Sequence, residues 1–370
     1  MSVDKNENEP GEQAGTAGPV ETAAPVETVE SVETAPGDAA GTSDPVDPAD
    51  SDELIGSAAA AEVAAATPER SAAAQKVTET LSRVDPKVGV AKPDMILTAT
   101  GVQRRFGGMT AVDVDHLEVQ RGAITALIGP NGAGKTTFFN LLTGFDKPNQ
   151  GKWEFEGRQI SRTSAAKLAR TGMVRTFQLT KALSRLTVLQ NMLLAAPGNP
   201  GENLFGSLFR PLWSGVEKRN TAKALGILDR FNLAAKKDDF AGSLSGGQRK
   251  LLEMARALMT DPTMIMLDEP MAGVNPALVQ SLLGHVQSLR DEGMTVLFVE
   301  HDMHAVRHIS DWVVVMAEGR IVAEGPPESV MQDQAVVDAY LGAHHDTDLG
   351  DDALLDPAVL ARLEAEEEKR

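Results

Sequence analysis

The chain of 370 residues contains no cysteine, a single tyrosine and few aromatic side chains. Without cysteine there is no disulfide, no thiolate nucleophile and no cysteine-ligated metal. No run approaches the roughly 18 apolar residues that a membrane span needs, and Trp312 to Ala317 is only a strand-sized burst. The start of the chain, Met1 to Lys5, stays polar, which argues against a secretory signal. These absences predict a soluble protein that faces the cytosol.

The negative charge lies at the two ends of the chain. Of 53 acidic and 35 basic residues, 18 and 5 fall within residues 1–90, and 9 and 3 within residues 344–370. The middle is therefore close to neutral, so the low isoelectric point does not exclude a nucleotide or a membrane surface as a partner. Both ends lack Phe, Trp and Tyr, and they cannot bury enough apolar surface to offset the entropy lost on ordering. We predict disordered acidic tails at 1–94 and 344–370.

Two short segments of these tails have helical character. Helix formers follow Thr67-Pro68, so Ser57 to Leu81 is expected to hold a fluctuating helix, with a stably docked helix as the alternative. Asp356 to Leu363 resembles a short capped helix that could dock on another subunit. The N-terminal tail is expected to act as a solvated spacer, with a partner-binding arm as the alternative.

The second half of the chain alternates short apolar strands with helices, which predicts a parallel sheet covered by helices. Strands are expected at Ile96–Val102, Val112–Val119, Ala123–Ile128, Trp153–Phe155, Met264–Leu267, Thr295–Val299, and in a hairpin of Trp312–Met316 with Arg320–Ala323. Helices are expected after Gly134, over Pro276–Arg290 and over Met303–Ile309, while residues 164–235 are predicted to be mostly helical. The pattern indicates one α/β domain over 95–343, with a helical insertion at about 180–260.

A glycine-rich loop after a buried strand matches the P-loop pattern G-x-x-x-x-G-K-[ST]. Its residues are Gly129, Pro130, Asn131, Gly132, Ala133, Gly134, Lys135, Thr136 and Thr137. Glycines let backbone amides turn toward phosphates, and the following helix presents its positive N-terminal end to the same anion. Lys135 would reach the outer phosphates of ATP, and the Thr136 hydroxyl would bind Mg²⁺. The alternative is a glycine-rich turn with a chance lysine.

Two adjacent carboxylates, Asp268 and Glu269, follow the predicted strand Met264–Leu267. The carboxyl end of such a strand lies at the same edge of a parallel sheet as the P-loop. Asp268 would then hold Mg²⁺ through water, and Glu269 would polarise the attacking water. A helix cap is the alternative, which the presence of the P-loop disfavours.

Between these motifs, Ser245, Gly246, Gly247 and Gln248 begin a helical pattern. A hydroxyl and unobstructed glycine amides at a helix N-terminus make a second anion site. The segment Leu244-Ser245-Gly246-Gly247-Gln248 resembles the signature of ABC transporter ATPases. The resemblance implies a P-loop NTPase fold of the ABC type, with an antiparallel β subdomain and a helical subdomain. It also implies that Ser245 and Gly247 face the γ-phosphate of a second subunit, so that two chains enclose two ATP molecules. A simple helix cap is the alternative.

Three further residues fit the same family. Gln178 is similar to the loop glutamine that contacts Mg²⁺ and the attacking water, and His301 is similar to the switch histidine on the γ-phosphate. Phe106 lies where the family stacks an aromatic ring under adenine, although a core role is the alternative. The resemblance therefore implies catalytic roles for Glu269, His301 and Gln178.

Three further segments narrow the resemblance to one group of ABC ATPases. The segment Ala272 to Pro276, the run Arg175 to Gln178 and the ending Ala339 to Gly342 are similar to the ATPase subunits of branched-chain amino acid importers. Asn275 stands where the family commonly has Asp, which leaves that residue's role open. The implied partners are a second ABC ATPase subunit, identical or related, membrane permease subunits, and indirectly an extracytoplasmic substrate-binding protein. No nucleic acid is expected, and the chain would lie on the inner face of the cell membrane.

Other functions remain as alternatives. Within the same class, the substrate could be urea, an amide or a lipid-linked polymer, because substrate choice rests with the permease. A non-transport ABC ATPase of DNA repair or translation is disfavoured, because the chain has neither long coiled coils nor a second ATPase unit. A GTPase is disfavoured further by the absence of an Asn/Thr-Lys-x-Asp motif after the P-loop.

Overall fold

A computed structural model describes residues 71–161, 163–176, 183–197 and 214–344. Residues 1–70 and 345–370, which make up most of the two expected tails and include the expected helix Asp356 to Leu363, lie outside these residues. Within them, no helix combines the length and the apolar character required to cross a bilayer.

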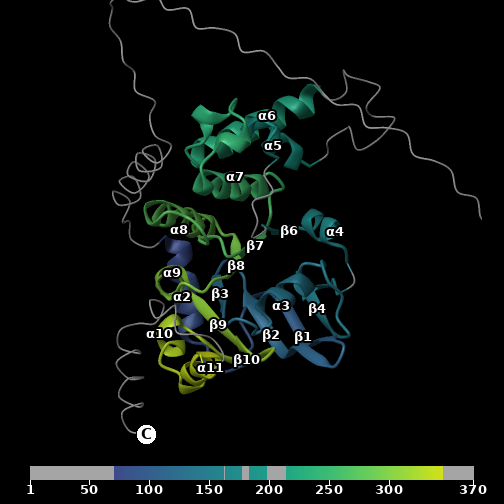
Figure 1. The fold of residues 1–370 in the computed structure, drawn as a ribbon, viewed down its shortest axis with the longest axis vertical. Helices are drawn as coiled ribbons and strands as arrows, with labels where there is room; N and C mark the ends of the chain where they lie inside the picture. The colour runs from purple at the N-terminus through teal and green to yellow at the C-terminus, as the bar shows by residue number, and fades with distance from the viewer. Residues whose placement is uncertain (1–70, 162, 177–182, 198–213, 345–370) are drawn as a thin grey trace, which may run out of the picture. The chain divides into compact units, whose positions relative to one another are not determined.

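Two sheets organise the described part of the chain (Figure 1). A six-stranded sheet has the order β10-β9-β3-β8-β7-β6, with only β10 antiparallel to its neighbour. Its strands are β3 (Ile124–Ile128), β6 (Met173–Arg175), β7 (Met264–Asp268), β8 (Thr295–Val299), β9 (Trp312–Ala317) and β10 (Arg320–Gly325). An antiparallel sheet of order β2-β1-β4-β5 contains β1 (Met95–Phe106), β2 (Met109–Gln120), β4 (Gln150–Phe155) and β5 (Arg158–Gln159). The mixed α/β class and the antiparallel sheet are confirmed.

The parallel strands are mostly apolar because both faces of their sheet are buried. Alternate residues of one strand point to opposite faces. Accordingly, Ile265 and Leu267 of β7 belong to one core cluster, while Met264 and Met266 belong to the other. Strands β7 and β8 are buried at every position, so their continuous apolar runs are what a sheet covered on both faces requires.

The helices follow the expected pattern in most places. They are α2 (Ala72–Ser82), α3 (Lys135–Leu142), α4 (Ala165–Arg170), α5 (Val188–Ala195), α6 (Ser214–Arg230), α7 (Gly246–Leu258), α8 (Pro276–Asp291), α9 (Met303–Ile309), α10 (Pro327–Val330) and α11 (Gln334–His344), with short 3₁₀ turns at Ala234–Lys236 and Ala241–Ser243. Helices α5, α6 and α7 contact one another within the region expected to hold the helical insertion. Where the structure describes residues 164–235, they are mostly helical, as expected. They also contain one strand that was not expected, β6, which extends the parallel sheet from β7.

Packed structure begins before the expected domain start at residue 95. Helix α2 is capped by Ser71, buries Ala74 and Leu81, and contacts α8. The expected fluctuating helix is in this structure a docked one. The segment that follows α2 adds polar contacts to the strands.

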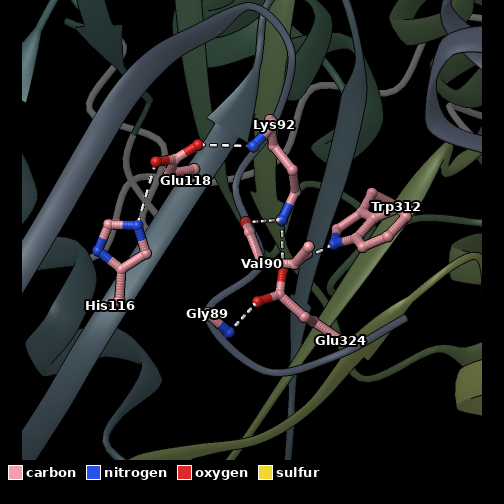
Figure 2. Close-up of polar contacts among 7 residues, drawn as sticks. All are labelled: Gly89, Val90, Lys92, His116, Glu118, Trp312 and Glu324. Atoms are coloured by element: carbon pink, nitrogen blue, oxygen red, sulfur yellow. Dashed lines mark hydrogen bonds and ion pairs between the residues drawn. The ribbon is translucent and has the colours of Figure 1, made fainter. Parts of the chain in front are cut away.

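The strongest of these contacts is made by Lys92 (Figure 2). Its ammonium lies 2.6 Å from the Glu324 carboxylate and 4.7 Å from the centre of the Trp312 ring, and its backbone amide donates to Glu118. Both side chains of the Lys92–Glu324 pair are almost completely buried. The indole of Trp312 donates to the same carboxylate. Burial lowers the pKa of Lys92, and the charge of Glu324 opposes that shift. The pair therefore fastens the leading segment to β2, β9 and β10.

Candidate nucleotide site

The turn between β3 and α3 leaves no room for side chains at two of its glycines. Gly129 has φ +147°, and a Cβ there would lie 2.0 Å from the Met316 carbonyl oxygen. Gly134 has φ +94°, and its Cβ would lie 2.3 Å from the Ala111 carbonyl oxygen. Only glycine fits at both positions. The chain thereby enters α3 in a tight turn that leaves Asn131 and Gly132 exposed.

Lys135, the first residue of α3, folds back over this turn. Its ammonium donates to the carbonyl oxygens of Gly129, at 2.6 Å, and Pro130, at 2.9 Å. Burial lowers the pKa of this ammonium, and the negative charge of Glu269 opposes that shift. A phosphate in the turn would supply the anionic partner that a buried cation needs. Thr136 is exposed beside it, in the first turn of the helix.

Asp268 ends β7 and is 3% exposed. Its Oδ2 accepts from Arg175 at 2.6 Å, and Arg175 also donates to Asn140 at 2.6 Å and to Thr143 at 3.1 Å. Its other oxygen, Oδ1, is buried and has no hydrogen-bond partner among the described residues. Such an oxygen suits water bound to Mg²⁺. The donor set of Asp268 with the Thr136 hydroxyl therefore fits this ion.

Glu269 adopts a backbone conformation that is rare for a residue with a side chain, with φ +46°. Its amide donates to the Val299 carbonyl at 3.0 Å, and its carbonyl accepts from the Lys250 ammonium at 3.2 Å. Strained conformations of this kind persist where surrounding contacts hold them, and they concentrate at functional sites. Lys250, from α7, is one such contact.

His301 follows β8, the strand beside β7, and its side chain is 52% exposed. Before it, Glu300 is 1% exposed and accepts hydrogen bonds from the amides of Met271, at 3.0 Å, and His301, at 3.1 Å. Burial raises the pKa of Glu300, while these amides oppose that shift. After it, Asp302 caps α9. The histidine ring is thus presented to solvent by a loop fixed on both sides.

The serine-glycine segment forms the N-terminus of α7. Ser245 caps the helix, and Gln248 completes a capping box by accepting from the Ser245 amide at 3.2 Å. Gln248 is 1% exposed, so in this structure its side chain supports the cap from within. A Cβ on Gly247 would lie 1.8 Å from a methyl carbon of Leu278 in α8, whereas a Cβ on Gly246 would only touch the Gly273 carbonyl oxygen at 3.8 Å. Of the four residues of this segment, Gly246 is exposed, Ser245 is half-buried, and Gly247 and Gln248 are buried.

Comparison with known proteins identifies this arrangement. The sequence model of the ABC transporter family matches residues 112–272, and one described as branched-chain amino acid ATP-binding cassette transporter matches residues 320–346. A probable branched-chain amino acid transport ATP-binding protein, LivG of Methanocaldococcus jannaschii, is 42% identical over 251 residues, which cover 67% of this chain and 97% of that protein. This chain belongs to the ABC transporter ATPases.

Further relatives agree with this assignment. The high-affinity branched-chain amino acid transport ATP-binding protein BraF of Pseudomonas aeruginosa is 41% identical, over 67% of this chain and 98% of that protein. A crystal structure of an ATP-binding cassette in its ADP conformation has 41% identity and a TM-score of 0.59, over 67% of this chain and 99% of that chain. A nucleotide-free cassette gives the same identity and TM-score. The chain is an ATP-hydrolysing subunit with a nucleotide-binding fold.

The structure of this ABC ATPase brings several predicted site residues together. The charge of Glu269 acts on Lys135, and Glu269 and His301 follow neighbouring strands. Phe106 ends β1 with a 46% exposed side chain, and the Arg104 guanidinium lies 4.4 Å from its ring centre. Its role in adenine stacking stays a prediction. Gln178 lies outside the described residues.

Sequence reasoning did not assign roles to three residues of this site. Arg175 holds Asp268, Lys250 holds the carbonyl of Glu269, and Glu300 joins the loops that follow β7 and β8. In a sequence, a basic or acidic residue beside a motif looks the same whether or not it takes part in the site. Arg175 and Glu300 differ from other charged residues because they are buried at or just after the end of a strand. That burial can be predicted only when the order of the strands in the sheet is known.

Proposed function

We propose that this chain powers an importer of branched-chain amino acids by hydrolysing ATP. The observation that carries the proposal is the pair of family matches, at 112–272 for the ATPase and at 320–346 for the branched-chain amino acid type. The names of the relatives, which are 41–42% identical over nearly their whole length, support the same substrate class. Residues 95–343 would be the ATPase unit, with residues 71–94 packed against it.

In this proposal, the turn Gly129–Thr137 binds the phosphates of ATP through backbone amides and Lys135. When bound, Mg²⁺ would neutralise phosphate charge, held by Thr136, Asp268 and Gln178. Glu269 orients the attacking water, and His301 holds the γ-phosphate. Phosphoryl transfer depends mainly on positioning and charge stabilisation, and the strained backbone of Glu269 supports positioning because it fixes the direction of its side chain.

The site is completed by a second ABC ATPase subunit, identical or related. The signature cap at Ser245 to Gln248 would be a second anion site on a chain that already has the P-loop. A single γ-phosphate does not need two such sites from one chain. The amides of the cap and the Ser245 hydroxyl would bind the γ-phosphate held by the partner's P-loop. ATP would then sit between two chains, and hydrolysis would release them.

Transport requires partners in the membrane. We propose that permease subunits dock beside Gln178 and the helical insertion, and that an extracytoplasmic binding protein delivers the substrate to them. The ATPase would then be peripheral on the inner face of the membrane.

Replacement of Glu269 by Gln tests the hydrolytic part of the proposal. The variant should bind MgATP, lose steady-state hydrolysis by about 10²-fold or more, and accumulate as a dimer in size-exclusion chromatography with light scattering. Glu328→Gln, an exposed glutamate of α10, is the matched control and should hydrolyse ATP normally. A Glu269→Gln variant that turns over normally, or stays monomeric in saturating MgATP alone and with related subunits, would contradict the proposal.

Uptake measurements test the substrate. Cells that depend on this chain and its permease should take up labelled leucine, isoleucine and valine, and lose that uptake with Glu269→Gln. Uptake of urea or short amides instead would overturn the substrate assignment and leave the ATPase assignment in place.

A further inference from the structure

The loops after β7 and β8 are joined by one buried side chain. The backbone ladder between these strands runs to Asp268 opposite Val299 and continues for one more hydrogen bond, from the Glu269 amide to the Val299 carbonyl. There the left-handed conformation of Glu269 turns its chain away. The two loops diverge at the point where each carries its proposed catalytic side chain.

Glu300 continues the connection where the ladder stops. Pro270 has no amide hydrogen, so the first backbone donor after Glu269 is the amide of Met271. That amide donates to Oε1 of Glu300 at 3.0 Å, and the His301 amide donates to Oε2 at 3.1 Å. One carboxylate therefore binds amides of both loops: that of Met271 in the first loop, and those of His301 and Asp302 in the second.

The cost of burying this carboxylate indicates that these bonds matter. Glu300 is 1% exposed, and no Lys or Arg pairs with it in the part of the chain that the structure describes. The nearest basic group is the His301 ring, with Nδ1 3.8 Å from Oε2. An unpaired buried charge is costly, whereas hydrogen bonds to an ionised acceptor are about twice as strong as neutral ones. A carboxylate with amide donors from both loops makes a stiffer link than a neutral acceptor.

We infer that Glu300 is a positioning residue for ATP hydrolysis, which makes the Glu269 loop and the His301 loop move as one unit. This inference rests on the proposed roles of Glu269 and His301. When the loop that starts at Glu269 shifts, the Met271 amide pulls on Glu300, and Glu300 carries the His301 backbone with it. The water-orienting and phosphate-holding groups then reach their working positions together. ATP binding itself depends on the P-loop and does not need this link.

Steady-state kinetics of the full-length chain test the inference through the separate responses of kcat and KM. Glu300→Ala removes both acceptors and should lower kcat by about 10- to 100-fold, because misplacement of about 1 Å can cost 10²-fold. Its KM for MgATP should stay within about twofold, as P-loop contacts are unchanged. Glu300→Gln keeps one acceptor oxygen and should fall between the wild type and Glu300→Ala. If both variants retain wild-type kcat, or if KM rises while kcat is unchanged, the inference is wrong.

A matched control separates positioning from general stability. Glu324 is also a buried glutamate, 3% exposed, with backbone and side-chain donors of its own (Figure 2). Glu324→Gln should lower the melting temperature and leave the kcat of the folded enzyme unchanged. If Glu324→Gln and Glu300→Gln lose the same amount of kcat, the loss comes from general destabilisation of the fold. The inference would then be refuted.

Nuclear magnetic resonance can test directly whether the Glu269 loop and the His301 loop move together. Methyl-labelled methionine reports on Met271, and labelled histidine reports on the His301 ring. Addition of ATP should shift both resonances together in the wild type, and Glu300→Ala should abolish that joint shift. Independent shifts in the wild type would overturn the inference.

His301→Ala distinguishes this inference from the proposed function. If His301→Ala hydrolyses ATP normally, the proposed role of His301 fails and the inference falls with it. If His301→Ala is inactive and both Glu300 variants are fully active, the proposed function stands and only the positioning role of Glu300 is refuted.

Discussion

A half-buried histidine of α8, His285, should make the stability of this ATPase depend on pH. The His285 ring stacks on the ring of Phe231, with centroids 4.4 Å apart and planes inclined by 25°. Burial, and after it the positive charge of Arg230, lower the pKa of His285 from 6.5 to about 4. The folded protein therefore disfavours the imidazolium, whereas the unfolded chain accepts the proton freely. The contribution of His285 to stability is therefore fully present above pH 6.5 and is lost as the pH falls from there toward 4.

The size of the loss follows from the two pKa values. A shift from 6.5 to about 4 corresponds to at most about 3 kcal/mol. At pH 5, where the unfolded histidine is charged and the folded one is still largely neutral, the loss from this residue alone is about 2 kcal/mol. That is a large part of the stability of an ordinary domain.

Urea denaturation at pH 7.5 and pH 5 measures this effect through the change in the free energy of unfolding. His285→Phe keeps an aromatic ring on Phe231 and removes the titration, so its pH-dependent loss should be smaller than that of the wild type by about 2 kcal/mol. His308→Gln, at an exposed position of α9, is the matched control and should behave like the wild type.

The reasoning is refuted if the wild type and His285→Phe lose the same free energy between the two pH values. It is also refuted if His308→Gln reproduces the effect, because the loss would then not depend on His285.

Two further predictions concern the phosphate turn. Gly129→Ala should destabilise the fold by about 2–5 kcal/mol and abolish nucleotide binding, because its Cβ meets the Met316 carbonyl at 2.0 Å. Gly132→Ala has an open environment at φ +80° and should cost only about 1 kcal/mol in the same denaturation assay; equal losses would contradict the steric argument. Lys135→Met should weaken binding of a fluorescent ATP analogue by about 10- to 100-fold, while the free energy of unfolding stays within about 1 kcal/mol, since a desolvated cation is removed. A large loss of stability would show that Lys135 mainly supports the fold.

Sequence reasoning predicted the parts of the fold whose signal is local. Strand β8 and helix α9 have the expected bounds because a continuous apolar run and an aspartate cap define them. Strand β6 was missed because three residues are too few to show a period, and it pairs only because β7 lies beside it. The motifs likewise indicated the P-loop and Asp268, since each is a contiguous segment.

The contacts that orient the site were not predictable in the same way. Arg175 meets Asp268 across 93 positions, and Glu300 meets Met271 across 29. Both contacts depend on which strands are neighbours in the sheet. The order of strands in a sheet cannot be inferred from a single sequence. The docking of α2 also escaped prediction, because the Lys92–Glu324 pair that supports it joins residues 232 positions apart.

The buried Lys92 has a practical consequence for anyone who shortens this protein. Trimming at Met95 would follow the visible motif boundary, yet it would strip the counter-ion from Glu324 and uncover the indole of Trp312. A carboxylate would then be stranded between β9 and β10, beside the strand that leads into the P-loop. A shortened chain that keeps Ser71 and the residues after it would retain both this ion pair and the capped helix α2.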